Sequence, residues 1–127
     1  MKAEVKEIGE RGVIFQYDDD NLVYLIKGKK RLYLCDTHEG PESMKIVKKY
    51  IEENDLVNKE LIVFNSHSDF DHNWGNCSFE DELIIGHKYN LERFKMRGEY
   101  DLKIKGHFQK GEVKLVYPNF TFDKKIS

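Results

Sequence analysis

Hydrophobic residues along this chain occur in short apolar runs, separated by charged or turn-forming segments. Such runs, bounded by Gly, Pro, Asn or Asp, are typical of β-strands. They predict strands at 13–15, 22–26, 32–35, 61–64, 83–85, 113–116 and 120–122. The glycine-containing segment 27–30 joins two of these runs, which indicates an antiparallel hairpin. Both runs of the hairpin are nearly continuous, so we expect them to be buried on both faces.

Helical spacing appears in two other segments. Pro41 precedes a helix that we expect over 42–54, because proline and acidic residues suit a first helical turn and apolar residues then recur at helical spacing. A second helix is expected over 87–96, ending near Gly98. The order of strands and helices predicts a single α+β domain, 1–127, in which helices pack on a mixed sheet.

Composition narrows the class of protein. Hydrophobic residues make up 39% of the chain, and 21 basic residues nearly balance 23 acidic ones. This balance argues against nucleic acid as a partner, because phosphate binding needs an excess of Lys and Arg. No apolar stretch approaches the roughly 20 residues that span a bilayer, and the charged N-terminus does not resemble a signal peptide. Cys35 and Cys77 lack metal or redox spacing, so we expect a reduced, cytoplasmic protein with no membrane contact.

Four potential metal ligands lie within six positions, directly after the apolar run 61–64. They are His67, Asp69, Asp71 and His72. In an extended segment the side chains of the first three would point to one side. The turn-forming residues 73–76 could redirect the chain so that His72 points to the same side. Imidazole and carboxylate ligands suit divalent ions such as zinc, iron or manganese. The cluster therefore predicts one or two metal ions, although Asp69 or Asp71 could instead cap the next helix.

The remaining polar residues of interest have weaker patterns. Asp18–Asp20 is interpreted as a solvated turn rather than a metal site. His38 either lines the same mouth as the ligand cluster or is an ordinary loop histidine. Other expectations are a capping or packing role for His87, surface exposure for His107, packing under the loop for Trp74, a core position for Cys35 and no ligand role for Cys77.

The cluster resembles the His-x-His-x-Asp-His signature of the metallo-β-lactamase superfamily, which is followed by Gly-Asn. His67, Asp71 and His72 match it, whereas Asp69 stands where the family usually has histidine. The segments 21–26 and 32–37 resemble the family's opening hairpin, which ends in Asp-Thr-Gly, with His38 at the position where that glycine is common. The segment 117–123 resembles the stretch before the family's third metal histidine.

This resemblance implies the N-terminal part of an αββα sandwich, with the remaining metal ligands supplied by a second half. It implies a hydrolase of a small-molecule ester, amide, thioester or phosphoester, in which Asp71 also orients the attacking water. The carboxylate of Asp69 favours iron or manganese and leaves a diiron redox relative open. The alternative is a non-catalytic or regulatory half-domain that binds a protein partner or pairs with itself as a homodimer.

Overall fold

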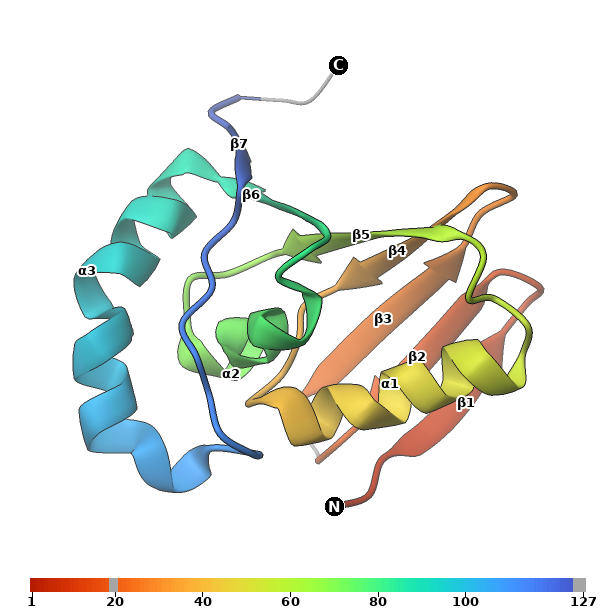
Figure 1. The fold of residues 1–127 in the computed structure, drawn as a ribbon, viewed down its shortest axis with the longest axis horizontal. Coiled ribbons are helices and arrows are strands. Elements are labelled where there is room, and N and C mark those ends of the chain that lie inside the picture. Colours follow the sequence, from red (N-terminus) through yellow and green to blue (C-terminus); the bar gives the residue numbers. More distant parts are fainter. Residues whose placement is uncertain (19–20, 125–127) are drawn as a thin grey trace.

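The computed structural model describes residues 1–18 and 21–124, in which seven strands form one sheet (Figure 1). The strands are β1 (Glu4–Ile8), β2 (Gly12–Gln16), β3 (Leu22–Lys27), β4 (Arg31–Cys35), β5 (Glu60–Asn65), β6 (Leu83–His87) and β7 (Phe120–Phe122). The helices are α1 (Pro41–Glu53), α2 (Phe70–Asn73) and α3 (Lys88–Lys105), with 3-10 turns η1 (Trp74–Phe79) and η2 (Gly106–Phe108). Within the described ranges, no helix has the length and apolar character needed to cross a membrane.

The strands lie in the sheet in the order in which they occur in the sequence. Strands β1 to β4 are antiparallel neighbours, and β4 to β7 are parallel neighbours. The predicted mixed sheet with packed helices is therefore confirmed, including the hairpin of β3 and β4. The parallel arrangement places the carboxyl ends of β4 and β5 side by side, where the loops that follow them can meet.

The core lies on one face of the sheet. Leu25 pairs with Leu34, Leu34 with Val63, and Val63 with Ile84, and all four side chains are fully buried. Helix α1 covers this face, and its apolar stripe belongs to the same cluster of buried residues (Figure 1).

The start of α1 depends on a glycine. Pro41 occupies the first helical turn, and the preceding Gly40 has a φ of 155°. A Cβ atom on Gly40 would collide with the carbonyl group of Lys110, so this close approach of two loops requires glycine.

The opposite face of the sheet is open. Tyr24, Ile26 and Tyr33 on β3 and β4 are 44%, 45% and 39% exposed, whereas the residues between them are buried. The prediction that these strands are buried on both faces is therefore wrong. Successive strand side chains point to opposite faces, and α1 covers only one of them. The outward positions carry large apolar residues, so the runs appear continuous in the sequence.

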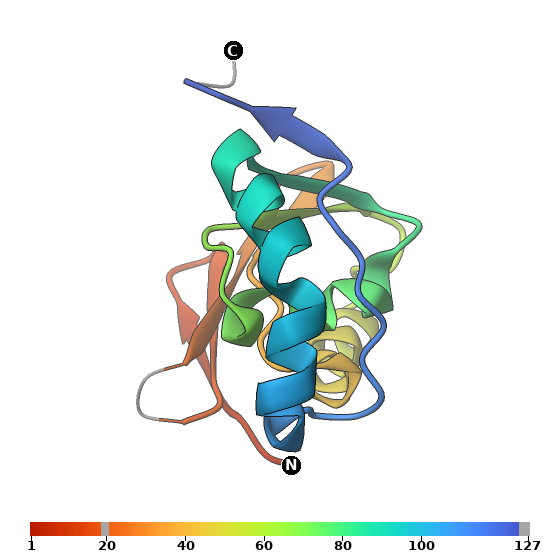
Figure 2. The ribbon, with the colours of Figure 1, turned by 90° about the vertical axis from the view of Figure 1, so that its left-hand side faces the viewer.

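Helix α3 continues through Gly98, where the sequence predicted an end. Gly98 is buried, and a Cβ there would lie 3.3 Å from the Leu115 side chain. One turn earlier, the ring of Phe94 packs edge-on against Tyr117 at 4.8 Å. The glycine therefore lets the helix lie close to the segment leading to β7 rather than ending it (Figure 2).

Two further differences concern strands. Residues 113–116 are not a strand; Val113 packs inward, and the carbonyl of Val116 accepts a hydrogen bond from the Asn76 side chain. Strand β1 was not predicted, because all five of its residues are exposed and its sequence shows no apolar face. The short strand predicted at 120–122 is confirmed as β7.

Candidate metal centre

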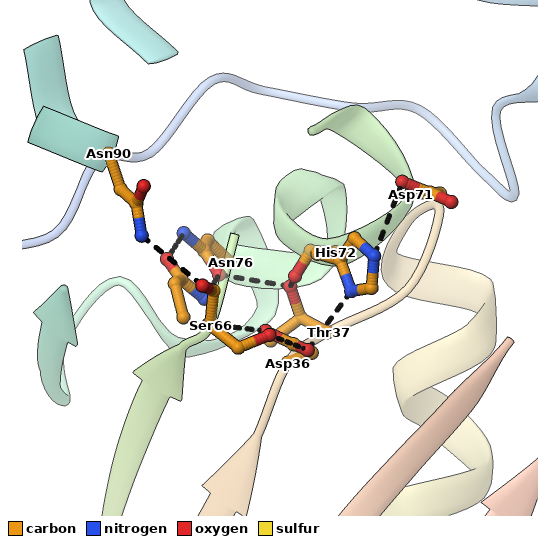
Figure 3. A network of polar contacts seen from close by, with 8 residues as sticks. Asp36, Thr37, Ser66, Asp71, His72, Asn76 and Asn90 are labelled. Carbon is orange, nitrogen blue, oxygen red and sulfur yellow. Dashed lines mark hydrogen bonds and ion pairs between the residues drawn. The ribbon is translucent and has the colours of Figure 1, made fainter. Parts of the chain in front are cut away.

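The predicted ligand loop lies against the loop that follows β4. Asp36 donates its backbone N–H to the carbonyl of Phe64 at 2.8 Å, and Thr37 donates its own to the carbonyl of His72 at 2.9 Å. The first bond continues the parallel pairing of β4 and β5 past Cys35, and the second joins the loop after β4 to α2. Segments distant in sequence therefore form one polar network (Figure 3).

Asp36 is the anchor of this network. The residue is 7% exposed, and its carboxylate accepts hydrogen bonds from the Ser66 backbone N–H at 2.7 Å, from the Ser66 hydroxyl, and from His72 Nδ1 at 3.0 Å (Figure 3). Its φ of 71° lies in the left-handed region, which aspartate tolerates better than most residues. Sequence analysis noted Asp36 only within the Asp-Thr motif and gave it no role.

His72 is oriented by Asp36. Because Nδ1–H donates to Asp36, the other ring nitrogen, Nε2, is directed toward Asp71, whose Oδ1 lies 3.6 Å away. The hydrogen bond to Asp36 raises the pKa of His72 above its ordinary value, and the negative charges of Asp36, Asp71 and Asp69 act in the same direction. A carboxylate that holds one imidazole nitrogen, leaving the other to face a ligand, is a common arrangement around metal-binding histidines.

The other predicted ligands surround His72 at different distances. The ring of His67 lies 4.7 Å from the ring of His72, between centroids, and is exposed. Asp69 is the residue before α2, and its carbonyl accepts from the backbone N–H of His72 at 3.0 Å. Its side chain makes no capping hydrogen bond, so the capping alternative finds no support at this position.

Asp69 and Asp71 also line a surface hollow with basic residues of α3, including Arg93, Arg97 and Lys105. Within residues 1–18 and 21–124, no three of the predicted ligands have ligand atoms within 4.8 Å of one another. His67 and Asp69 lie in the loop before α2, whereas Asp71 and His72 lie in α2, so the extended segment expected to carry the first three ends before Asp71. The structure does not close the four residues around a point. Their assignment as metal ligands stays a prediction.

The buried side-chain amide of Asn76 connects the segments around the ligand cluster. The Asn76 side chain donates to Asn65 Oδ1 at 2.8 Å and to the Val116 carbonyl at 2.9 Å. It also accepts from Asn65 Nδ2 at 3.0 Å and from the Thr37 hydroxyl at 2.9 Å. Asn76 therefore uses all of its hydrogen-bonding capacity to join η1, β5, the loop after β4 and the segment before β7.

A second group of potential ligands lies beside the first. Asp18, His38 and Glu39 have ligand atoms within 4.8 Å of one another. His38 lines a cavity together with Asp71, which agrees with the first of the two alternatives considered for it. The interpretation of Asp18–Asp20 as only a solvated turn missed this grouping for Asp18; Asp19 and Asp20 lie outside the described residues.

The remaining sequence predictions have mixed outcomes. His87 caps α3 by accepting from the backbone N–H of Tyr89 at 3.1 Å, as expected. His107 is exposed and Trp74 is buried under the ligand loop, also as expected. Cys35 was expected in the core but is only half-buried.

Comparison with known proteins gives the fold its context. The sequence matches no protein-family model and no curated protein. Among solved structures, the chain is similar to the metallo-β-lactamase from Hirschia baltica, with TM-score 0.68 and 10% identity over 99% of this chain and 54% of that one. The chain shares the metallo-β-lactamase fold.

Two other structures support the same conclusion. The enzyme from Pontibacter korlensis gives TM-score 0.64 and 16% identity over 95% of this chain and 53% of its own. The mono-zinc form of FIM-1 from Pseudomonas aeruginosa gives TM-score 0.64 and 8% identity over 77% of this chain and 47% of its own. The chain spans about half the length of the metallo-β-lactamases that it matches. At these identities the likeness establishes the fold, and function requires separate arguments.

Proposed function

We propose that this chain is the N-terminal part of a metal-dependent hydrolase of the metallo-β-lactamase superfamily. His67, Asp69, Asp71 and His72 would hold one or two divalent ions, zinc, iron or manganese. The observation that supports this most is the pairing of His72 with the buried carboxylate of Asp36, which leaves Nε2 directed toward Asp71. An imidazole held in this way is prepared to coordinate a metal, and the neighbouring carboxylates match the chemistry of such a site.

The residues of the chain define what each would contribute. When bound, the ion supplies Lewis acidity that polarises an ester, amide, thioester or phosphoester. Asp71, partly exposed beside His72, would accept a hydrogen bond from a water molecule and orient it. Asp36 acts as a positioning residue through His72. Because the chain spans about half of the similar enzymes, we propose that further ligands come from a second half.

Metal content tests the first part of this proposal. Protein purified without chelator or affinity-tag metal should contain about one or two equivalents of ion by elemental analysis. Replacing His67→Ala should lower the content, whereas His107→Ala, which removes an exposed histidine from η2, should not. Asp36→Asn should weaken metal affinity by about 10- to 100-fold, as expected for a residue that orients a ligand. Equal metal content in His67→Ala and His107→Ala would reject the assignment.

A second candidate is a half-domain that binds a protein partner without catalysis. The observation that favours it is the open apolar face of β3 and β4. An activity screen over esters, thioesters, β-lactams and phosphodiesters distinguishes the two, provided that the metal-loaded chain is compared with the chelated one. Metal-dependent turnover lost in His67→Ala supports the hydrolase. A chain without turnover whose metal content is equal in His67→Ala and His107→Ala supports the binding half-domain, because the proposed hydrolase binds metal through His67 even without its second half.

A further inference from the structure

His38 is held rigidly in the loop between β4 and α1. It is 2% exposed and has a φ of 57°. Its ring stacks on that of Tyr17, with centroids 4.2 Å apart and planes 11° from parallel. Tyr17 is itself fixed, because its hydroxyl donates to the carbonyl of Ser43 at 2.7 Å. The direction of both ring nitrogens of His38 is therefore set by packing.

The contacts of His38 are compatible with a proton on Nδ1. Nδ1 lies 2.7 Å from the hydroxyl of Ser43, and that hydroxyl is directed at the sulfur of Met1 at 3.4 Å. While this hydroxyl donates to Met1 it accepts from His38, and in that tautomer the proton is on Nδ1. Nε2 then keeps its lone pair, and it has no hydrogen-bond partner among the described residues.

Nε2 is directed toward Glu39. Glu39 Oε1 lies 3.4 Å from Nε2, and the Glu39 side chain is 9% exposed. Burial lowers the pKa of His38 to about 4 and raises the pKa of Glu39. Both pKa shifts mean that a charged imidazole or carboxylate is poorly solvated here. A bare lone pair facing a buried carboxylate oxygen is repulsive unless a cation or a proton lies between them.

We propose that Asp18, His38 and Glu39 bind a divalent transition-metal ion at a site separate from the His67–His72 cluster. One imidazole and two carboxylates form a donor set suited to iron(II), manganese or zinc. The spacing also fits, because two ligand atoms about 2.1 Å from a tetrahedral ion lie about 3.4 Å apart. The third ligand, Asp18, is exposed, so an ion could reach the buried pair from solvent.

Lys110 provides an internal check on the proposal. It lines the same cavity, and its charge lowers the pKa values of both His38 and Glu39. A positive charge beside the site opposes a bound cation. Replacing Lys110→Met, which keeps a long apolar stem, should therefore tighten metal binding. An unchanged affinity would mean that the ion binds elsewhere.

Calorimetric titration with Mn²⁺ and Zn²⁺ tests the site directly. The starting protein carries His67→Ala and His72→Ala, which removes two ligands of the other cluster. His38→Asn then removes Nε2 while tolerating the positive φ. Glu39→Gln removes one charge with little change of shape. Each change should weaken binding by at least about tenfold, the lower range for disturbing a metal site. The control, Glu112→Gln, removes an exposed acid and should leave affinity unchanged.

The outcomes separate this site from the proposed hydrolytic centre. One equivalent lost with His67→Ala and His72→Ala, and another with His38→Asn, supports both. Binding that disappears entirely in the starting protein, or that is equal in His38→Asn and Glu112→Gln, overturns the present inference. In the unaltered chain, Zn²⁺ should shift the imidazole Nε2 resonance of His38. A resonance unmoved at saturating Zn²⁺ also overturns it, whether or not the variants fold.

Discussion

The buried amide of Asn76 should carry a measurable share of the stability of the chain. We consider Asn76→Leu, which keeps a side chain of similar size and removes all polar atoms. Asn76 is 0% exposed and its partner Asn65 is 1% exposed, so water cannot replace the lost contacts without opening the fold. The change leaves both polar atoms of the Asn65 side-chain amide and the carbonyl of Val116 without their hydrogen-bond partner.

The size of the effect follows from these stranded groups. The hydroxyl of Thr37 has a second acceptor, the carbonyl of His72 at 3.2 Å, so it does not count among them. Each buried polar group left unpaired costs about 1–3 kcal/mol. With partial relaxation, three such groups give a loss of about 4 kcal/mol, a large part of the roughly 5–15 kcal/mol that stabilises a typical domain.

Urea unfolding, followed by circular dichroism, measures this loss. Asn58→Leu is the matched control, because Asn58 is exposed and the substitution is chemically identical. In the double variant Asn65→Leu/Asn76→Leu, the Asn65 amide is no longer present to be stranded. The double variant should therefore lose at least about 1 kcal/mol less than the sum of the single changes. A loss near that of Asn58→Leu, or strictly additive single changes, would refute the reasoning.

Three further predictions concern other parts of the molecule. Burial and the charge of Asp36 raise the pKa of Cys35. Alkylation of Cys35 in a Cys77→Ser background should therefore need a higher pH in the folded chain than in the chain unfolded in guanidinium. Coincident pH profiles for the two states would contradict this. Gly75→Ala places a Cβ against the loop after β4 and against α1, and should cost about 3 kcal/mol or more in urea unfolding. Gly106→Ala, which meets only the flexible end of a side chain, should be nearly neutral; equal costs would show that the close approach does not matter. The open face of β3 and β4 should pair with a second copy of the chain, giving a light-scattering mass of two chains at micromolar concentration, and Ile26→Lys should return the mass of one. A single-chain mass before substitution rejects self-association.

Local sequence was sufficient for much of the fold. Apolar runs bounded by glycine and charged residues identified six of the seven strands of the described sheet, and Pro41 marked the start of α1. Prediction from local sequence failed where tertiary contacts decide the structure. Gly98 has the features of a helix end, but the neighbouring segment 113–117 makes it a packing position. The apolar residues of β3 give no sign that one face of the sheet would be left open.

In the candidate sites, too, some features are visible in the local sequence and others depend on tertiary contacts. The cluster from His67 to His72 is visible because its members are adjacent in sequence. The role of Asp36 is not visible, since its partners Ser66 and His72 are 30 and 36 positions away and meet it only because β4 and β5 are parallel neighbours. Asp18 and His38 also come from separate loops. Their proximity depends on the packing of Tyr17 against the His38 ring, and no spacing rule anticipates it.

The sequential order of the strands has a consequence for synthesis. Each strand pairs with the one made just before it, so the sheet can grow at a single edge, from β1 toward β7, as the chain leaves the ribosome. Pairing between successive strands keeps the loops to be closed short. His72 can reach Asp36 once β5 has joined β4, before α3 has left the ribosome. His72 is therefore expected to be anchored on the nascent chain before α3, whose basic residues line a hollow with Asp69 and Asp71, takes its place.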